Sequence, residues 1–172
     1  AVIVAIFLFY SHRARVNDAW DKLSQAEVFA YSGRPTEAQS LIKQVTEGGA
    51  SPAATTLARM LEGDMIYPSG KFDEAAAAYD KAIESAPDAL RPYATADKVM
   101  TLEAAGKFAD CATIAQAFLE ANPDHLLAAQ VHTVLARCQV ALGQSEAAQS
   151  TLQRISLQYR DTPWAQWANE RL

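Results

Sequence analysis

Apolar residues recur along most of the chain with the period of an α-helix, in segments separated by glycine and proline. In the clearest segment, Ala75, Tyr79, Ala82 and Ile83 lie at i, i+4, i+7 and i+8, on one helical face. No segment shows the alternation typical of a strand. The pattern therefore predicts an all-α fold. First helices are predicted at 16–32, 53–67, 92–105 and 124–142, second helices at 36–47, 72–85, 108–121 and 146–159, and a short last helix at 163–172.

The segments form an internal repeat that is marked by four glycines. Gly33, Gly70, Gly106 and Gly143 are separated by 37, 36 and 37 residues. A glycine can end a helix because it has no β-carbon and adopts positive φ easily. Proline residues follow two of the second helices and prevent them from continuing. Each unit is therefore predicted to be a helix, a tight turn and an antiparallel helix, and a fixed period of this length is typical of a solenoid.

The second unit carries a recognisable signature. Residues 70–75, with Tyr79, Ala82 and Pro87, resemble the second helix of the tetratricopeptide repeat (TPR), and Gly63 stands where that family has its first-helix glycine. The third unit is similar, and the first and fourth are degenerate. The resemblance implies a right-handed α-solenoid of about four helical hairpins. The expected repeats cover about 16–51, 52–88, 89–123 and 124–161, followed by a capping helix at 162–172.

The first ten residues contain no polar side chain before the Tyr10 hydroxyl. As a helix they would span about 15 Å, half of a ~30 Å hydrocarbon core. We expect residues 1–15 to be the C-terminal part and flank of a transmembrane anchor, whose first half would precede Ala1. Tyr10 would lie at the interface, and Arg13 and Arg15 just outside it. Two alternatives are the core of a signal peptide, which would lack a small-residue cleavage signal, and a helix buried on all sides.

Composition narrows the classes of partner and of site. The 172 residues include 15 Lys and Arg against 20 Asp and Glu, which gives a net charge of −5. This balance argues against nucleic acid as the main partner. Half of the residues are apolar, too many for a disordered chain. Two cysteines exclude a disulfide-stapled miniature fold and a four-cysteine zinc site.

No catalytic motif is present. The chain lacks a glycine-rich phosphate loop, a His-Glu-x-x-His sequence and a nucleophile elbow. His125 and His132 are seven residues apart, but no further metal ligands accompany them. We therefore expect a protein without catalytic activity, cofactor, metal or small-molecule substrate. An enzyme whose site leaves no sequence pattern stays as an alternative.

The two cysteines fall at the adjacent ends of two predicted antiparallel helices. Cys111 opens the second helix of the third unit, and Cys138 lies late in the first helix of the fourth. A disulfide would need Cα atoms within about 6–7 Å and would indicate an oxidising compartment. The alternative is a pair of small buried side chains at alanine-like positions.

The TPR resemblance also implies a binding surface. In this family the first helices line the concave face, where extended peptides or helices bind. The candidate protein-binding residues are Trp20, Glu27, Tyr31, Leu57, Asp64, Tyr67, Tyr93, Met100, Glu103, Gln130, Thr133 and Arg137. Any of them could instead pack between helices. Leu23 and Glu27 stand where chaperone-tail receptors carry cations or amides, which disfavours that role.

Two tryptophans lie at i, i+3 in the last predicted helix and share a face. Trp164 and Trp167 would either cap the final repeat or form an aromatic patch for a partner.

The layout is similar to single-pass bacterial proteins whose periplasmic TPR domain accompanies the Sec translocon or assists envelope protein assembly. We expect a non-catalytic scaffold in the bacterial inner membrane that binds membrane-complex subunits or client polypeptides, with a chaperone-like or recruitment role. The repeats would be periplasmic, although Arg13 and Arg15 favour the cytoplasmic side. The alternative is a structural accessory subunit of a larger membrane complex.

Overall fold

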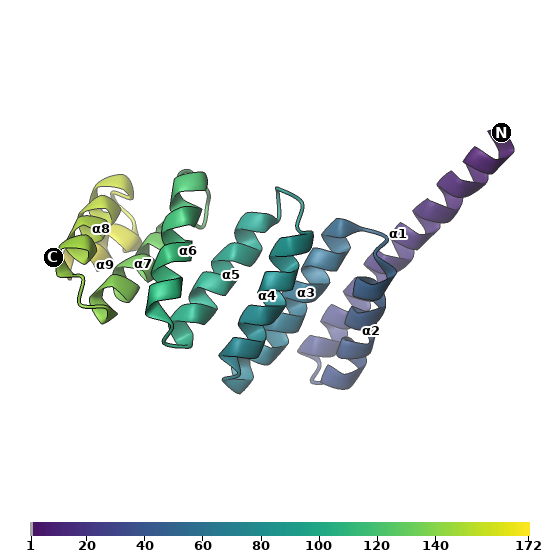
Figure 1. Cartoon of the computed structure of the whole chain (residues 1–172), viewed down its shortest axis with the longest axis horizontal. Helices are drawn as coiled ribbons and strands as arrows, with labels where there is room; N and C mark the ends of the chain where they lie inside the picture. The colour runs from purple at the N-terminus through teal and green to yellow at the C-terminus, as the bar shows by residue number, and fades with distance from the viewer. Residues whose placement is uncertain (1) are drawn as a thin grey trace. The chain divides into compact units, whose positions relative to one another are not determined.

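The computed structural model describes residues 2–172, and within this range the secondary structure is helical throughout. The helices are α1 (Val2–Tyr31), α2 (Pro35–Gly48), α3 (Pro52–Ile66), the 3-10 helix η1 (Tyr67–Ser69), α4 (Phe72–Ser85), α5 (Arg91–Ala104), α6 (Phe108–Ala121), α7 (Ala128–Ala141), α8 (Ser145–Gln158) and α9 (Pro163–Asn169). Figure 1 labels these helices along the chain. The chain divides into two compact units, one ending at Ala94 and the other comprising Thr95–Leu172. The predicted all-α fold is confirmed.

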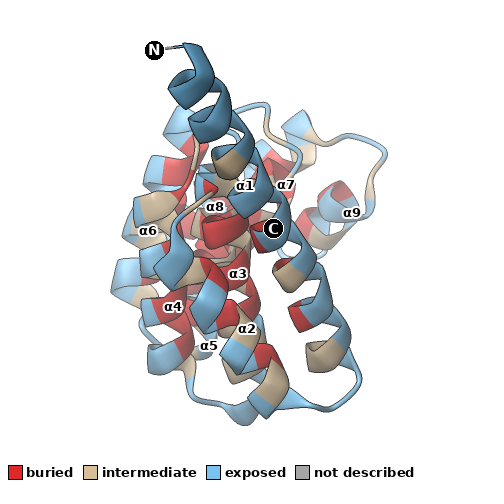
Figure 2. Cartoon of the chain, turned by 90° about the vertical axis from the view of Figure 1, so that its right-hand side faces the viewer, coloured by how far each residue is buried: buried red, intermediate tan, exposed pale blue. Residues whose placement is uncertain are grey.

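The first unit consists of two helical hairpins. Helix α1 packs against α2, α3 packs against α4, and α3 also contacts α1 and α2. Its core is formed by small and branched side chains from the inner faces, which Figure 2 shows as buried stripes. Ala19, Leu23 and Ala26 come from α1, and Ile42 and Val45 from α2. The alanines let the helix backbones approach closely, while the larger side chains fill the space beside them.

The second unit is built around α7. This helix contacts α6, α8 and α9, and ten of its 14 residues are buried. Helix α9 closes the end of the unit, where Ala168 joins a buried cluster with Leu152 and Ile155, and Trp167 packs against that cluster. Trp164 is 38% exposed. The two tryptophans thus differ, since one covers the core and the other faces solvent.

The repeating glycines end helices as the sequence predicts. Gly33, Gly106 and Gly143 have φ near +70°. At each, the next residue donates its backbone N–H to the carbonyl five residues earlier, as Arg34 does to Phe29 at 2.9 Å, which is the Schellman arrangement. Gly70 also has positive φ but follows η1, whose extra turn separates α3 from α4.

Some helix bounds differ from the prediction. Helices α4 and α6 have the predicted limits, but α7 begins at Ala128, four residues later than expected. The reason is a turn at His125, whose Nδ1 accepts the Leu127 N–H at 3.2 Å and whose carbonyl accepts the Ala128 N–H at 2.8 Å. Helix α1 continues without interruption into the N-terminal apolar stretch.

Residues 2–15 of the predicted anchor segment form the N-terminal part of α1. Among residues 2–172, no helix is both long enough and apolar enough to cross a bilayer. The apolar run ends at Tyr10, because Ser11, His12 and Arg13 follow it, so only Val2–Tyr10 is continuously apolar here. Ala1, the first residue of the predicted anchor segment, lies outside the described residues.

Gly63 of α3 lies directly against the ring of Tyr79 of α4. A β-carbon at position 63 would lie 2.6 Å from Cζ of Tyr79. The tyrosine ring is 3% exposed, and its hydroxyl donates to Oδ1 of Asp64 at 2.6 Å. The ring therefore cannot swing away to make room, and glycine is required by packing.

This contact predicts the effect of Gly63→Ala. The substitution should lower the free energy of unfolding by about 1–3 kcal/mol, because the added methyl group overpacks a filled site. Gly48→Ala is the matched control, since a β-carbon there meets no atom within 4 Å. The control should leave stability unchanged or raise it by up to about 1 kcal/mol. Chemical denaturation followed by circular dichroism measures both, and equal stabilities for the two variants would refute the steric argument.

Candidate functional site

The predicted binding residues of α1 lie together on an exposed face. Trp20, Glu27 and Tyr31 are spaced at i, i+7 and i+11, which places them on one side of the helix beside its buried stripe. Trp20 is 40% exposed and Tyr31 is 86% exposed. Two amphipathic aromatic side chains are thus presented to solvent by a rigid helix.

Some of the predicted binding residues in and just after α3 make contacts within the first unit instead of being free for a partner. Leu57 packs against the core of the first unit. Asp64 accepts the hydrogen bond from Tyr79, and burial raises the pKa of its carboxyl group while that hydrogen bond partly offsets the effect. Tyr67 begins η1 and packs edge-on against Phe72, with ring centroids 5.1 Å apart. Of these three, Asp64 and Tyr67 are exposed, and Leu57 is partly buried. Tyr93, near the end of this unit, is half-buried.

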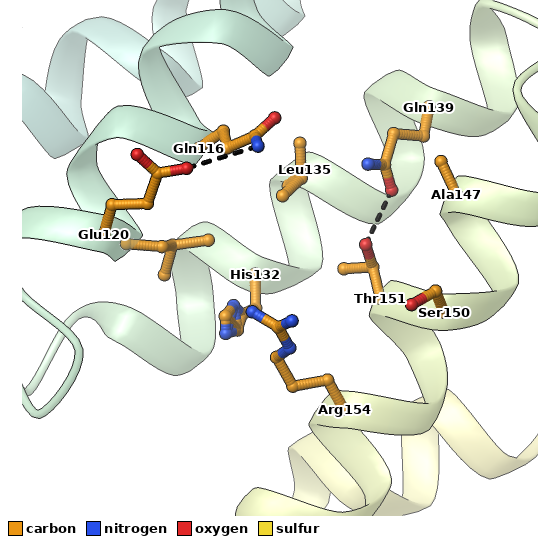
Figure 3. A pocket seen from close by; sticks show the side chains of 10 residues that line it. Gln116, Glu120, His132, Leu135, Gln139, Ala147, Ser150, Thr151 and Arg154 are labelled. Carbon is orange, nitrogen blue, oxygen red and sulfur yellow. Dashed lines mark hydrogen bonds between the residues drawn. The ribbon is translucent and has the colours of Figure 1, made fainter.

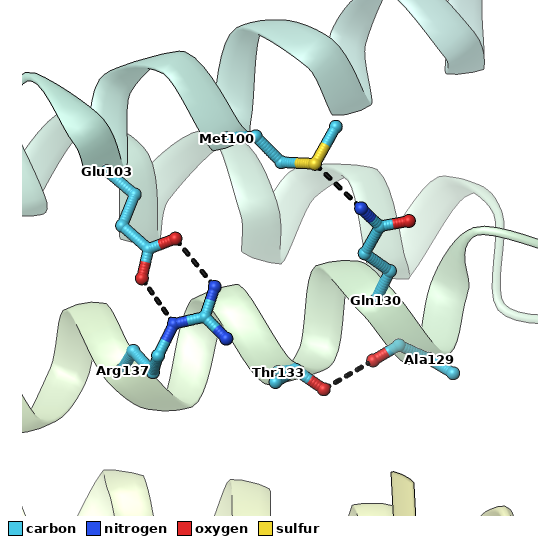
Figure 4. A network of polar contacts seen from close by, with 6 residues as sticks. All are labelled: Met100, Glu103, Ala129, Gln130, Thr133 and Arg137. Carbon is cyan, nitrogen blue, oxygen red and sulfur yellow. Dashed lines mark hydrogen bonds and ion pairs between the residues drawn. The ribbon is translucent and has the colours of Figure 1, made fainter. Parts of the chain in front are cut away.

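The predicted residues of the second unit are brought together by α5 and α7 (Figure 4). Nε2 of Gln130 donates to Sδ of Met100 at 2.7 Å. Arg137 makes two bonds to Glu103, Nε to Oε1 at 2.5 Å and Nη2 to Oε2 at 2.7 Å. These paired contacts fix the register of α5 against α7.

The arginine–glutamate pair has a defined electrostatic consequence. The hydrogen bonds from Arg137 to Glu103 raise the pKa of the guanidinium group. The side chains remain 45% and 21% exposed, so the pair contributes only about 0.2–1 kcal/mol. The charges compensate each other, and Thr133 beside them is buried with its hydroxyl bonded to the Ala129 carbonyl at 2.9 Å. This surface is suited to hydrogen bonding and apolar contact more than to the capture of a charged ligand.

The two cysteines meet inside the second unit. Cys111 of α6 and Cys138 of α7 are fully buried, and their thiols are unbonded but hydrogen-bonded to each other. This hydrogen bond, followed by burial, raises the pKa of Cys111, and the same bond lowers the pKa of Cys138. Oxidation of this pair to a disulfide stays a prediction.

A pocket that the sequence analysis missed lies in the second unit (Figure 3). It has a volume of about 380 Å³ and is bordered by α6, α7 and α8. His132 and Gln139 of α7 and Arg154 of α8 are among its lining residues. The available signal was a pair of polar residues at i, i+7 within the apolar pattern of α7. Within residues 2–172, no cluster of three or more His, Cys, Asp or Glu side chains could hold a metal ion.

Comparisons with known proteins agree with this architecture. Family models described as tetratricopeptide repeat match residues 23–89 and 102–169, and together they cover most of the chain. The chain is also similar to a crystal structure described as kinesin light chain nearly identical TPR-like repeats, from Podosopora anserina. That similarity has a TM-score of 0.65 at 16% identity and covers 86% of this chain and 80% of the other. No curated protein sequence matches.

The buried cysteine pair makes a prediction about thiol reactivity. In the folded protein both thiols should react slowly with a thiol-specific reagent, because neither side chain reaches solvent. In denaturant without reductant, two thiols should react at once, and Cys111→Ala and Cys138→Ala should each remove one. Spectrophotometric titration measures this. If no thiol reacts in denaturant before reduction, the cysteines form the disulfide that the sequence analysis left open.

Proposed function

The chain is a TPR repeat protein, and we propose that it is a non-catalytic, membrane-anchored scaffold that binds other proteins at the bacterial envelope. TPR repeats are typical of proteins that bind protein partners and have no catalytic activity, which supports the scaffold part of the proposal. The proposed role is chaperone-like or recruiting. The membrane part depends on one observation about α1.

That observation is the exposure of the N-terminal end of α1. Every large apolar side chain from Val2 to Tyr10 is more than half exposed, and together they surround the helix. Contiguous apolar surface of this kind is rare on soluble monomers and marks an interaction site. A surface that is apolar on all sides matches a lipid environment better than a protein groove, which would cover one face only.

The residues after this stretch suit a lipid interface. Tyr10 is an aromatic residue of the type enriched at that depth, and Arg13 and Arg15 are exposed where anionic headgroups would lie. We propose that the stretch inserts into the inner membrane and that the repeats face the periplasm, as in the single-pass TPR proteins that this layout resembles. The two arginines on the side of the repeats weigh toward the opposite orientation.

The exposed face of α1 supports a role in binding polypeptides. Trp20 and Tyr31 offer large apolar areas with polar ends, the side-chain types that dominate protein interfaces. They lie on a helix held firmly by its buried stripe, so binding would not need to order them first. A structural accessory subunit would instead bury the same face against a fixed partner.

The membrane proposal predicts binding to vesicles. The chain should co-sediment with phosphatidylethanolamine–phosphatidylglycerol vesicles, and Ile3→Ser with Phe7→Ser should abolish this by placing hydroxyl groups in the inserted surface. Arg13→Gln with Arg15→Gln should weaken binding by about 2 kcal/mol, roughly 30-fold, and only for anionic vesicles.

The matched control for this experiment is Leu126→Ser with Leu157→Ser, which changes two equally exposed leucines in the second unit. These substitutions should leave co-sedimentation unchanged. Failure of the unmodified chain to bind either neutral or anionic vesicles would contradict the membrane anchor. Equal losses in the control and test variants would contradict the assignment to α1.

The chaperone-like role predicts binding of an unfolded polypeptide. A reduced and carboxymethylated model protein should bind with micromolar affinity, measured by fluorescence anisotropy. Trp20→Ala and Tyr31→Ala should each weaken binding at least about fivefold, because each removes about 1 kcal/mol or more of interface energy. Val28→Ala, which changes an exposed valine elsewhere on the same helix, is the control. Absence of binding would contradict this role and favour the accessory subunit.

A further inference from the structure

The pocket of the second unit is a groove with exposed walls and a buried floor. Helix α6 supplies Gln116 and Glu120 to one wall, and α8 supplies Ser150 and Arg154 to the other. These four residues are exposed. The floor comes from α7, where His132 is 5% exposed. The groove has a volume of about 380 Å³, which is in the range of sites that hold a small ligand or a few side chains.

The floor contains a polar group that the fold does not satisfy. Gln139, the other polar residue there, accepts a hydrogen bond from the Thr151 hydroxyl at 2.8 Å. In contrast, Nδ1 of His132 is buried and has no hydrogen-bond partner among the described residues. A buried polar atom without a partner costs about as much as a lost hydrogen bond, and native structures contain few of them. The imidazole therefore has unused hydrogen-bonding capacity at the base of the groove.

The charge beside this imidazole is also uncompensated. Figure 3 shows the guanidinium group of Arg154 next to the ring of His132. Burial and the charge of Arg154 lower the pKa of His132 to about 4, so the ring is neutral at pH 7. Tyr159 packs edge-on against the same ring, with centroids 5.9 Å apart, and keeps it from turning freely. Arg154 forms no ion pair within residues 2–172, so this end of the groove carries one unpaired positive charge.

The opposite wall restricts which anion fits. Glu120 is the one carboxylate among the lining residues, and it accepts a hydrogen bond from Nε2 of Gln116 at 3.3 Å. A doubly charged phosphate would meet this carboxylate and the net charge of −5 on the whole chain. A single carboxylate can bind Arg154 and stay clear of Glu120. Neighbouring backbone N–H groups of a peptide can donate to Glu120 across the groove.

We propose that this groove is a second protein-binding site, which takes a short peptide segment and holds one glutamate or aspartate side chain between Arg154 and His132. One carboxylate oxygen accepts from the guanidinium group, and the other accepts from the imidazole once its proton is on Nδ1. The site uses neither Val2–Tyr10 nor the exposed face of α1. Its failure would therefore leave the proposed membrane scaffold untouched, and failure of that scaffold would leave this site untouched.

The test uses the full chain and two synthetic peptides that are acetylated, amidated and identical except for a central Glu or Gln. Imidazole resonances report binding by NMR, and His12 and His125 serve as internal controls. The Glu peptide should shift the His132 signals and raise the pKa of His132 by at least one unit, because a bound carboxylate stabilises the protonated ring. The Gln peptide and inorganic phosphate should not do so at the same concentrations.

Two arginine variants locate the charge. Arg154→Gln should weaken binding of the Glu peptide at least tenfold, as expected for loss of a charge-assisted hydrogen bond. Arg160→Gln, which removes an exposed arginine just beyond α8 that does not line the groove, should change binding less than twofold. Both positions are on the surface, so both variants should fold.

Three results would overturn the proposal. In the first, no peptide shifts His132 at millimolar concentration, which would mean that only water completes the imidazole. In the second, the Glu and Gln peptides bind equally, or phosphate alone reproduces the effect of the Glu peptide. In the third, Arg154→Gln and Arg160→Gln weaken binding to the same degree.

Discussion

The close approach of antiparallel helices is the constraint on which each hairpin of this protein depends. Small residues at the crossing points set that distance, and large side chains then fill the remaining space. Gly63 and Tyr79 are the extreme case of this packing, since the tyrosine ring occupies the volume that any β-carbon at position 63 would take. The ring is then fixed by the hydrogen bond from its hydroxyl to Asp64. Packing and polar contacts thus support each other at one site, and Asp64 is committed to the fold although its spacing suggests a binding residue.

The helices and turns of the chain could be predicted because they depend on local chemistry. Glycine at the end of a first helix permits positive φ, and the apolar spacing of the following segment sets the face that is buried. For this reason α4 and α6 have the predicted limits. The start of α7 could not be predicted, because it is set by the ring nitrogen of His125 accepting a backbone N–H, a contact that has no periodic signal. No helix among residues 2–172 is both long enough and apolar enough to cross a bilayer, and the predicted anchor at the start of α1 stays a prediction.

The candidate binding residues were harder to predict than the helices. The spacing within a first helix gives the face on which a residue lies, and it places Trp20 and Tyr31 correctly on the exposed side of α1. It does not give the register between neighbouring helices, and register decides which side chains neutralise one another. Glu103 and Arg137 are 34 residues apart in sequence and form a bidentate pair. The charge of each residue is therefore neutralised by the other in the contact between α5 and α7. Sequence spacing alone could not reveal this contact.

The groove above α7 has no periodic signal in the sequence, and its chemistry differs from that of the first-helix surface. A histidine within an apolar helix is predicted to be a core residue, and His132 is indeed buried. What distinguishes it is the absence of a partner for Nδ1 among the described residues, together with an arginine beside it that is also unpaired. Glu103 and Arg137 neutralise each other, so that surface gains little from a charged ligand. At His132 the hydrogen bonds and the charge are both incomplete, and a ligand that supplies one carboxylate would complete them together. Such a difference between two surfaces of one unit would let it bind two polypeptides by different chemistry, one through side chains such as Met100 and Gln130 and the other through the recognition of a carboxylate.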